Sequence, residues 1–357
     1  MNKIAIIAPS SRAYTPYLAY YESILNDAGI RYEIFFWDRF HINEKGIKGK
    51  TFVCNSPDHG LGSILGYVGY RRFLLNELRG GNYSTFIVLS VQMGVLLYQF
   101  LQNKKFILDI RDFSHENKSL YRFLANRLIK KAAAVVISSD GFRAWLPKDR
   151  SYVLSHNVSL ESFNNNNSPL RFYPDRLVIS YIGGVSYYEA NLRVINTVSH
   201  NHKILLRYIG SGTCEKELEA YCTDNKIKNV EFLGRYTPEQ KLSFYDDTDF
   251  VLSCYGNNTE VVRSLTPNRL YEACLLGRPI IVNTDTYLAK LVGDYGIGIV
   301  VDLEKMDDLH EKLLAYIEPE TYALYIENCE KFIEKVRDDV GDFRSRIKEI
   351  LSSEVDK

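Results

Sequence analysis

Short aliphatic and β-branched runs alternate along the chain with longer segments whose apolar residues recur about every 3.6 positions. Between residues 1 and 160, the runs with the composition of buried strands are KIAIIA (3–8), RYEIFFW (31–37), TFIVLS (85–90), KFILDI (105–110), AAVVIS (133–138) and YVLSH (152–156). Segments between them have helical spacing, for example YLAYYESILNDAG (17–29) and SLYRFLANRLIKK (119–131). Strands that are apolar on both faces and alternate with helices predict a parallel sheet covered on both sides.

The pattern restarts after NNNNSP (164–169), a composition typical of a linker. The later runs are LVISYIGG (177–184), HKILLRYIGSG (202–212), NVEFLG (229–234), DFVLSCYG (249–256), RPIIVNT (278–284) and GIGIVVD (296–302). We predict an α/β protein with two doubly wound parallel-sheet (Rossmann-like) domains, whose ligands bind in a cleft beyond the carboxyl ends of the strands. The predicted limits are 1–165 and 170–335, with a C-terminal helix, 336–357, that packs back on the first domain.

The length of 357 residues agrees with two domains, and the composition is that of a folded, globular chain. The formal net charge is zero, but residues 1–160 hold 21 Lys and Arg against 12 Asp and Glu, and the remainder holds 23 against 32. The basic half could contact an anionic membrane or polyanion, and uneven surface charge without a partner explains it equally well. No nucleic-acid-binding motif accompanies the charge, so we expect no nucleic acid partner.

The sequence shows no pattern for secretion, membrane crossing or metal binding. The longest apolar stretch, residues 86–101, is shorter than the roughly 20 residues that a bilayer requires and contains several polar residues. The six cysteines are scattered without CxxC spacing, which indicates a reducing compartment and no structural zinc. We expect no metal and no cofactor besides the substrates, because lone aspartates do not make a divalent-metal site. These features predict a cytoplasmic protein.

The stretch LTPNRLYEACLLGRPIIV (265–282) predicts a helix running into a buried strand. Thr266 suits the N-cap, Pro267 the first helical position and Gly277 the residue after the last turn, so the helix should cover about 267–276.

Two charges interrupt the helical part of this stretch. Arg269 would lie in the first turn of the helix, where free amides already concentrate positive charge, and a bound phosphate or diphosphate would make that position favourable. Glu272 lies one turn later on the same side. A surface Arg–Glu pair is the commoner explanation of this spacing, but the apolar surroundings favour a carboxylate that faces a cleft or a ligand hydroxyl.

Glycines follow three strands of the second half, at Gly183-Gly184, at Gly210-Ser211-Gly212 and at Gly234. Glycine in such a loop lets the backbone approach a phosphate closely. None of the three forms a complete phosphate-binding motif, and an ordinary turn is the commoner explanation of each.

Taken in order, these segments resemble a known family. YIGGVSYYEANLRVINTV, LRYIGSGTCEKELEAY, NVEFLGRYTPEQKLSFYDDTDFVLSCY, TPNRLYEACLLGRPIIV and GIGIVVD resemble the donor-binding half of family 4 glycosyltransferases of bacterial polysaccharide biosynthesis, which are retaining enzymes with the two-domain GT-B fold. The resemblance covers most of residues 175–302 and extends more weakly through KFILDIRDF, AAAVVISSDGFRAWL and YVLSHNVSLESF of the first half.

The resemblance implies a role for each matching residue. Glu272 matches the second glutamate of the family's Glu-(seven residues)-Glu motif, which holds the ribose hydroxyls, and Arg269 matches a lysine that meets the diphosphate in part of the family. The glycine pair would approach the diphosphate, Tyr236 would border the base, and the residues from Ser264 onward would lie against the transferred sugar. The substrate-binding residues implied are Gly183, Gly184, Tyr236, Arg263, Ser264, Leu265, Thr266, Pro267 and Asn268.

The sequence departs from the family at several of these positions. Ser264 stands where the first glutamate is expected, and Gly184 and Ala190 stand where many relatives carry an Arg and a Lys for the diphosphate. Pro9-Ser10-Ser11-Arg12 replaces the usual N-terminal di-glycine loop. Anion binding should therefore depend on Arg269 and backbone amides, with Arg263 or Arg111 as further candidates.

In the first half, Arg111 occupies the place where many relatives have a histidine near the transferred sugar. An arginine stays protonated, so it cannot act as a general base, but it could stabilise charge on the departing diphosphate. Asp112 could orient Arg111 or meet the acceptor hydroxyl. A pair of charges that closes the strand end is an equally good explanation. His115 and His156 lack the partner spacing of a catalytic or metal site.

The resulting hypothesis is a retaining, metal-independent glycosyltransferase with Arg111, Asp112, Arg269 and Glu272 as catalytic candidates. Its donor would be a UDP- or GDP-sugar, and its acceptor a hydroxyl of a glycan or polyprenyl-linked glycan, as in capsule or O-antigen assembly. The segments 66–79 and 119–131 mix aromatic, leucine and basic residues, so the N-terminal domain could lie peripherally on the inner, anionic face of the cell membrane. The alternatives are a sugar-nucleotide epimerase of the same fold and a non-catalytic sugar-nucleotide-binding subunit.

Overall fold

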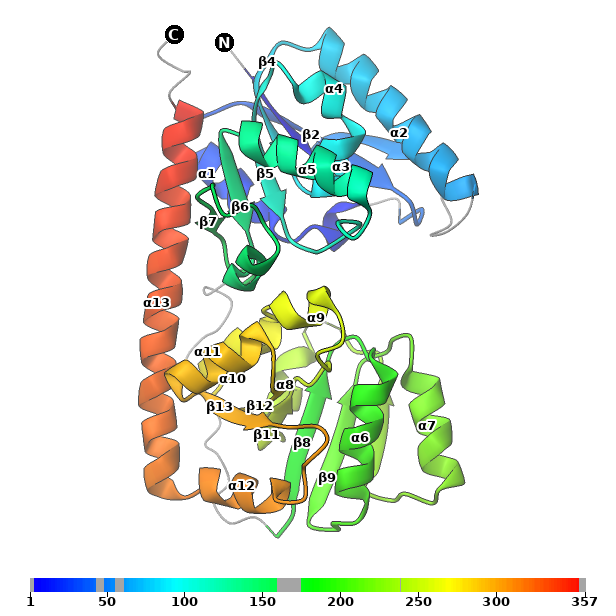
Figure 1. The fold of residues 1–357 in the computed structure, drawn as a ribbon, viewed down its shortest axis with the longest axis vertical. Coiled ribbons are helices and arrows are strands. Elements are labelled where there is room, and N and C mark those ends of the chain that lie inside the picture. Colours follow the sequence, from blue (N-terminus) through cyan, green and yellow to red (C-terminus); the bar gives the residue numbers. More distant parts are fainter. Residues whose placement is uncertain (1–2, 43–47, 55–60, 159–174, 238, 353–357) are drawn as a thin grey trace. The chain divides into compact units, whose positions relative to one another are not determined.

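The structure is a computed structural model that describes residues 3–42, 48–54, 61–158, 175–237 and 239–352 (Figure 1). The chain forms two compact units: unit 1 is Met1–His156 with Asp338–Lys357, and unit 2 is Asn157–Arg337. The predicted linker and the predicted limits at 165 and 170 lie outside the described residues.

Unit 1 is built on a seven-stranded sheet with the order β3-β2-β1-β4-β5-β6-β7, and every strand pair in it is parallel. Its elements up to residue 156 are β1 (Lys3–Ile7), η1 (Arg12–Tyr14), α1 (Leu18–Asp27), β2 (Tyr32–Asp38), β3 (Lys50–Val53), α2 (Leu61–Gly80), β4 (Tyr83–Val88), α3 (Val91–Leu96), α4 (Tyr98–Leu101), β5 (Lys105–Ile110), α5 (Ser119–Lys131), β6 (Ala134–Ile137), η2 (Asp140–Ala144) and β7 (Val153–Leu154).

Both faces of the unit 1 sheet are buried under helices. Along β1, Ala5 and Ile7 pack into one core cluster with side chains of α2, α3 and α5, while Ile4 and Ile6 pack into a second cluster with α1. Successive strand residues point to opposite faces, so a strand covered on both sides must be apolar at every position. Figure 1 shows α2, α3 and α5 on one face of this sheet.

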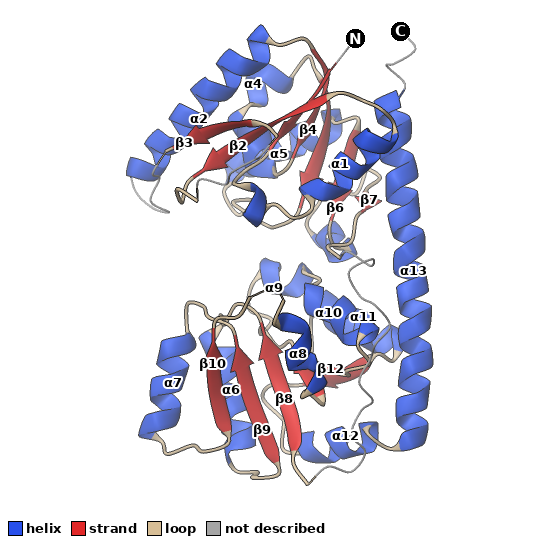
Figure 2. Cartoon of the chain, turned by 180° about the vertical axis from the view of Figure 1, so that it is seen from behind, coloured by secondary structure: helices blue, strands red, loops and turns tan. Residues whose placement is uncertain are grey.

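Unit 2 repeats this architecture with a six-stranded sheet of order β10-β9-β8-β11-β12-β13, again parallel throughout. Figure 1 shows α6 in front of β8 and β9, and Figure 2, from behind, shows α8 on the opposite face. Its elements are β8 (Leu177–Ile182), α6 (Tyr188–Ser199), β9 (Ile204–Ile209), α7 (Glu215–Asp224), β10 (Val230–Gly234), α8 (Lys241–Asp246), β11 (Phe250–Leu252), α9 (Glu260–Ser264), α10 (Asn268–Leu275), β12 (Ile280–Asn283), α11 (Tyr287–Tyr295), β13 (Gly298–Val301) and α12 (Leu309–Tyr316).

The last helix, α13 (Pro319–Ser352), contributes to both units. Side chains in its first part, such as Phe332, belong to the core of unit 2. Phe343, Ile347 and Leu351 of its last part belong to the unit 1 cluster that also contains α1. Phe343 meets Tyr21 of α1 edge to face, with ring centroids 5.6 Å apart.

The predicted fold class is confirmed, because both sheets are parallel and alternate with helices. Each apolar run identified in the sequence contains a strand of the structure. The prediction missed β3, whose residues are mostly exposed at the edge of the sheet and therefore lack a continuous apolar run.

We expect Phe343→Ala to destabilise unit 1 by about 3–5 kcal/mol, because the buried ring leaves a cavity between α13 and α1. Urea denaturation followed by circular dichroism measures this loss. Arg344→Ala is the matched control: it removes an exposed ion pair with Asp27 from the same turn of helix and should change stability by about 1 kcal/mol or less. Equal losses in the two variants would contradict the packing role of Phe343.

Candidate functional site

The start of α10 presents free main-chain amides at the carboxyl edge of the unit 2 sheet. The prediction of Thr266 as N-cap was wrong by one residue: Pro267 takes that position with φ −78° and ψ 154°, an extended conformation that cannot continue the helix, and no side chain caps it. The predicted stop is confirmed, since Gly277 follows the helix with φ +64°. Unsatisfied amides at a helix start of this length favour an anion.

Arg269 is buried in the first turn of α10. Its guanidinium carbon lies 3.7 Å from the ring centre of Tyr181 and 5.3 Å from that of Tyr255. Its Nη1 donates to the carbonyl of Leu252 at 2.9 Å. No carboxylate among the described residues forms an ion pair with it. A buried cation held by aromatic faces and one carbonyl, without a counter-ion, is suited to an anionic ligand.

The loop after β8 runs directly beside this guanidinium. Gly183 has φ +132°, and a Cβ there would lie 3.3 Å from Nη2 of Arg269. A Cβ on Gly210, which follows β9, would lie 2.1 Å from the carbonyl oxygen of Gly183. Close packing of the two loops therefore requires glycine at position 210, and the backbone conformation favours glycine at both positions. Gly184, in contrast, has open space around its Cα.

Glu272 lies one turn further along α10, and it is also buried. Its carboxylate accepts a hydrogen bond from the Tyr245 hydroxyl at 2.6 Å and forms an ion pair with Lys241, both from α8. Burial, followed by the charge of Glu272, raises the pKa of Tyr245 well above its usual range, so this phenol stays protonated and donates. Glu272 and Arg269 thus form no surface ion pair, and each has its own environment.

Tyr236, in the loop before α8, belongs to the same cluster. Burial and then Glu272 raise the pKa of its phenol, whereas Arg269 lowers it, so the ring lies within electrostatic reach of both charged residues. Together, the side chains of Arg269, Glu272 and Tyr236 and the backbone at Gly183 form one group at the carboxyl edge of the sheet. We call this group the α10 cluster.

The other predicted residues of unit 2 lie on the segment that leads into α10. The Ser264 side chain is buried and its hydroxyl donates to the Glu260 carbonyl of its own helix, α9. Arg263 is exposed, and its Nε donates to the Asn257 carbonyl at 2.6 Å. Asn268 is exposed and accepts from the Asn157 side chain at 3.0 Å. Leu265, Thr266 and Pro267 are half-buried.

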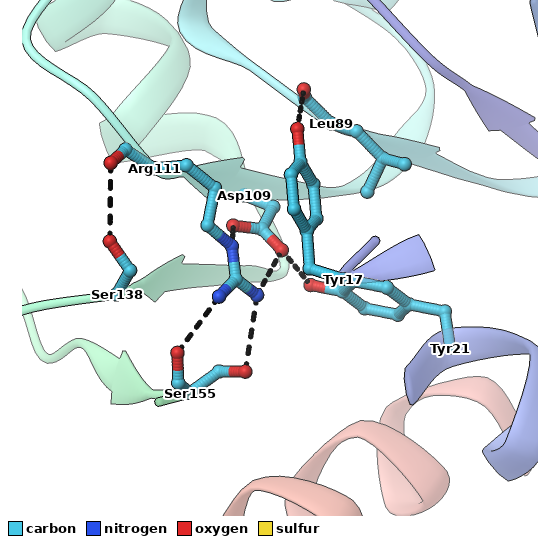
Figure 3. Close-up of polar contacts among 7 residues, drawn as sticks. All are labelled: Tyr17, Tyr21, Leu89, Asp109, Arg111, Ser138 and Ser155. Carbon is cyan, nitrogen blue, oxygen red and sulfur yellow. Dashed lines mark hydrogen bonds and ion pairs between the residues drawn. The ribbon is translucent and has the colours of Figure 1, made fainter. Parts of the chain in front are cut away.

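In unit 1, Arg111 is fixed by Asp109, the first aspartate of the DIRD sequence (Figure 3). Nε and Nη2 of Arg111 lie 2.6 and 2.8 Å from the two carboxylate oxygens of Asp109, and its Nη1 donates to the Ser155 carbonyl at 2.9 Å. Tyr17 stacks on the guanidinium at 4.6 Å, and Tyr21 donates to Asp109 at 2.7 Å. Burial lowers the pKa of Arg111, but Asp109 outweighs this effect and holds the pKa above its usual range.

This network uses most of the hydrogen-bonding capacity of Arg111. One explanation of DIRD was a pair of charges that closes a strand end, and the contacts of Arg111 agree with it. The catalytic role of Arg111 stays a prediction. Asp112 is exposed beyond the end of β5. His115 is exposed beside Tyr121, and His156 lies 3.1 Å from Asp339 of α13. In the loop that replaces the di-glycine motif, Arg12 forms an ion pair with Glu22 of α1.

Comparison with known proteins agrees with this geometry. Residues 162–339 match the family model described as glycosyl transferases group 1. No curated protein sequence matches the chain significantly. The chain belongs to the group 1 glycosyltransferases.

Solved structures of low sequence identity share the fold of this glycosyltransferase. Alr3699/HepE of Anabaena in complex with UDP has 16% identity and a TM-score of 0.68, over 99% of this chain and 100% of that one. A sucrose-phosphate synthase from Thermosynechococcus elongatus has 12% identity and a TM-score of 0.75, with 99% and 100% covered. The lipopolysaccharide outer core galactosyltransferase WaaB has 17% identity and a TM-score of 0.66, with 98% and 99% covered. These likenesses support the GT-B fold.

In this glycosyltransferase, several residues that contact the α10 cluster were not predicted from the sequence. Lys241 and Tyr245 engage Glu272, and Tyr181 and Tyr255 hold Arg269. Tyr187, which precedes α6, has φ +67° and meets Tyr255 with ring centroids 5.4 Å apart. No spacing rule links these positions to α10, but tyrosines at the ends of two apolar strands are a signal that could have marked the site.

Among the described helices, none is long and apolar enough to cross a bilayer.

We expect Arg111→Met to destabilise unit 1 by about 3–5 kcal/mol, because it leaves the fully buried Asp109 carboxylate without its counter-ion. The urea denaturation midpoint measures the effect. Arg143→Met is the matched control: Arg143 pairs with Asp140 at 2.6 Å in an exposed position, so the loss should be about 1 kcal/mol or less. An Arg111 variant that is as stable as the control would show that the network does not support the fold.

Proposed function

We propose that the protein is a retaining, metal-independent glycosyltransferase that moves a sugar from a UDP- or GDP-sugar to a hydroxyl of a glycan or polyprenyl-linked glycan. The observation that supports it most is Arg269: a buried guanidinium at the start of a helix and beside a glycine loop, with no carboxylate partner among the described residues. This arrangement suits a diphosphate, whose two negative charges need both a cation and main-chain amides.

In this proposal, Arg269 and the first amides of α10 bind the diphosphate and stabilise its charge as the sugar leaves. Gly183 lets the backbone approach the same group, and the ring of Tyr236 borders the base. Glu272 accepts hydrogen bonds from the ribose hydroxyls. A carboxylate has about four lone-pair sites, so the contacts with Lys241 and Tyr245 leave acceptor capacity for a ligand. Structures of Alr3699/HepE contain UDP or UDP-glucose, and this favours UDP as the nucleotide of the donor here.

We expect Glu272→Ala to weaken UDP or GDP binding and to lower turnover of the matching sugar nucleotide by roughly ten- to a hundredfold, through loss of charge-assisted hydrogen bonds. Calorimetry measures binding, and nucleotide release measures turnover, over a panel of UDP- and GDP-sugars. Glu219→Ala, an exposed carboxylate on α7, is the control and should leave both unchanged. Unchanged binding in the Glu272 variant would remove this residue from the site.

The same assays address mechanism. Activity should persist in EDTA, because the charge on the diphosphate would be met by Arg269. The sequence Asp247-Thr248-Asp249 has D-x-D spacing, but Asp249 is buried and accepts a hydrogen bond from the Val178 amide. The anomeric proton of the transferred sugar, followed by NMR, should show retained configuration. Product that forms from the sugar nucleotide alone, without acceptor, would instead favour an epimerase, and nucleotide binding without turnover would favour a non-catalytic subunit.

We also propose that unit 1 lies on an anionic membrane surface, as a polyprenyl-linked acceptor would require. Helices α2 and α5 pack on the same face of the sheet. Large apolar side chains on α2 and α5 are strongly exposed: Ile64 (60%), Leu65 (69%), Val68 (58%), Leu120 (72%) and Phe123 (55%). Arg122 and Arg127 accompany them on α5. Exposed apolar groups beside basic residues favour insertion at the interface of a bilayer.

We expect the double variant Leu65→Glu/Phe123→Glu to bind vesicles of phosphatidylglycerol at least about tenfold more weakly than the unmodified protein, because two apolar contacts become repulsive charges. Vesicle co-sedimentation at low salt measures the affinity. Leu324→Glu is the control, since Leu324 is 55% exposed on the part of α13 that belongs to unit 2. Equal binding by all three proteins would contradict the proposed surface.

A further inference from the structure

Arg39 lies in unit 1 and has no part in the proposed donor site. It is the first residue after β2, at the carboxyl edge of the sheet, and it is half-buried. Its guanidinium carbon lies 3.8 Å from the ring centre of Trp37 and 4.9 Å from that of Tyr67 on α2. Trp37 is fully buried, so the guanidinium rests on a rigid support.

The donors of Arg39 lack partners within the described part of the chain. Its Nε is buried and donates to no acceptor among the described residues, and none of their carboxylates forms an ion pair with the side chain. Every other buried or half-buried arginine that the structure describes has a polar partner: Arg12, Arg71, Arg111, Arg150, Arg207, Arg269, Arg278 and Arg344. Buried polar groups are rarely left unsatisfied, so an exception of this kind calls for a ligand.

The nearest carboxylate in the sequence is directed elsewhere. Asp38 accepts hydrogen bonds from the amides of Phe40 and Ile42 at 3.3 and 3.1 Å, and Ser11 lies 3.4 Å from the same oxygen. Asp38 therefore serves the turn after β2 and does not neutralise Arg39. The guanidinium keeps its full charge at the edge of the sheet.

Tyr67 connects this cation to other polar groups of unit 1. The Tyr67 hydroxyl donates to Oε1 of Gln92 at 3.4 Å, and Gln92 lies in the first turn of α3, directly after β4. On α5, the Tyr121 hydroxyl is buried without a partner, as is Oε1 of Glu116. Burial and then Glu116 raise the pKa of Tyr121, and Tyr67 adds a smaller effect, which links the two tyrosines. The groups come from three elements that meet at one edge of the sheet.

We propose that Arg39 is an anion-binding residue of the acceptor site and that it binds a carboxylate or phosphate of the acceptor. This inference rests on the proposed function, in which unit 1 receives the acceptor. The planar fork of a guanidinium matches the two oxygens of either anion. Stacking on Trp37 and Tyr67 fixes its orientation before the ligand arrives, so little side-chain freedom is lost on binding. The anion could be a uronic acid of the glycan or the phosphate of its lipid carrier.

Tryptophan fluorescence tests the proposal directly. The chain has two tryptophans, Trp37 and Trp145, so a Trp145→Phe background leaves Trp37 as the reporter beside Arg39. Titrations with methyl glucuronide, octyl phosphate below its micelle concentration and neutral methyl glucoside distinguish a sugar carboxylate from a lipid phosphate and from uncharged sugar. Calorimetry with the same ligands gives an independent affinity.

We expect one of the two anions to bind and the neutral glycoside to bind much more weakly. Arg39→Gln should weaken binding of the anion roughly ten- to a hundredfold. Arg39→Lys should weaken binding less, because a point charge remains although the planar fork of donors is lost. The control is Arg31→Gln, an exposed arginine at the opposite end of β2, which should bind as the background does. Circular dichroism checks that each variant is folded.

Two outcomes would overturn the proposal: neither anion binds the background protein, or Arg39→Gln binds the anion as tightly as the control. A change in thermal stability alone would assign Arg39 a purely structural role. The titrations contain no sugar nucleotide, so their result is independent of donor turnover. Donor turnover without anion binding would leave the proposed function intact and refute this inference alone.

Discussion

A guanidinium that is removed from water must be compensated, and the two units compensate their buried arginines in opposite ways. In unit 1, Arg111 meets both oxygens of Asp109 and the backbone of Ser155, so its charge is balanced within the fold. In unit 2, Arg269 rests on Tyr181 and Tyr255 and has one carbonyl as partner. The first arrangement is complete without a ligand, whereas the second leaves positive charge at a helix start.

This difference explains why tyrosines, and no carboxylate among the described residues, contact Arg269 of the α10 cluster. An aromatic face attracts a guanidinium without neutralising it, whereas a carboxylate in the same place would compete with a phosphate for the donors. The one carboxylate in the cluster, Glu272, is kept from Arg269 by its contacts with Lys241 and Tyr245. The fold thus separates a cation from an anion only one helical turn apart, and each keeps its own set of contacts.

The fold could be predicted from the sequence because its signals are local. Apolar strands, helical spacing and the helix stop at Gly277 each depend on neighbouring residues, and the structure confirms them. The edge strand β3 lacked such a signal, since it is mostly exposed. In the site, the positions of Arg269 and Glu272 on one helix were predictable. The residues that engage them, such as Lys241, come from other elements, and no spacing in the sequence encodes a contact made by tertiary packing.

The departures from the family can be understood from the same packing. Ala190 is buried in α6, and the position of Gly184 is open, so neither supplies a cation to the glycine loop. Ser264 is buried and donates to its own helix, so a glutamate there would need to leave that environment to meet a ligand. In the proposed donor site, the positive charge that the family resemblance assigns to several side chains would therefore rest on Arg269 and the free amides of α10. Such a site has little redundancy. A diphosphate that loses the guanidinium keeps only neutral donors, which are roughly half as strong as charge-assisted ones, so donor recognition should depend more on this one side chain than it does in relatives with three cations.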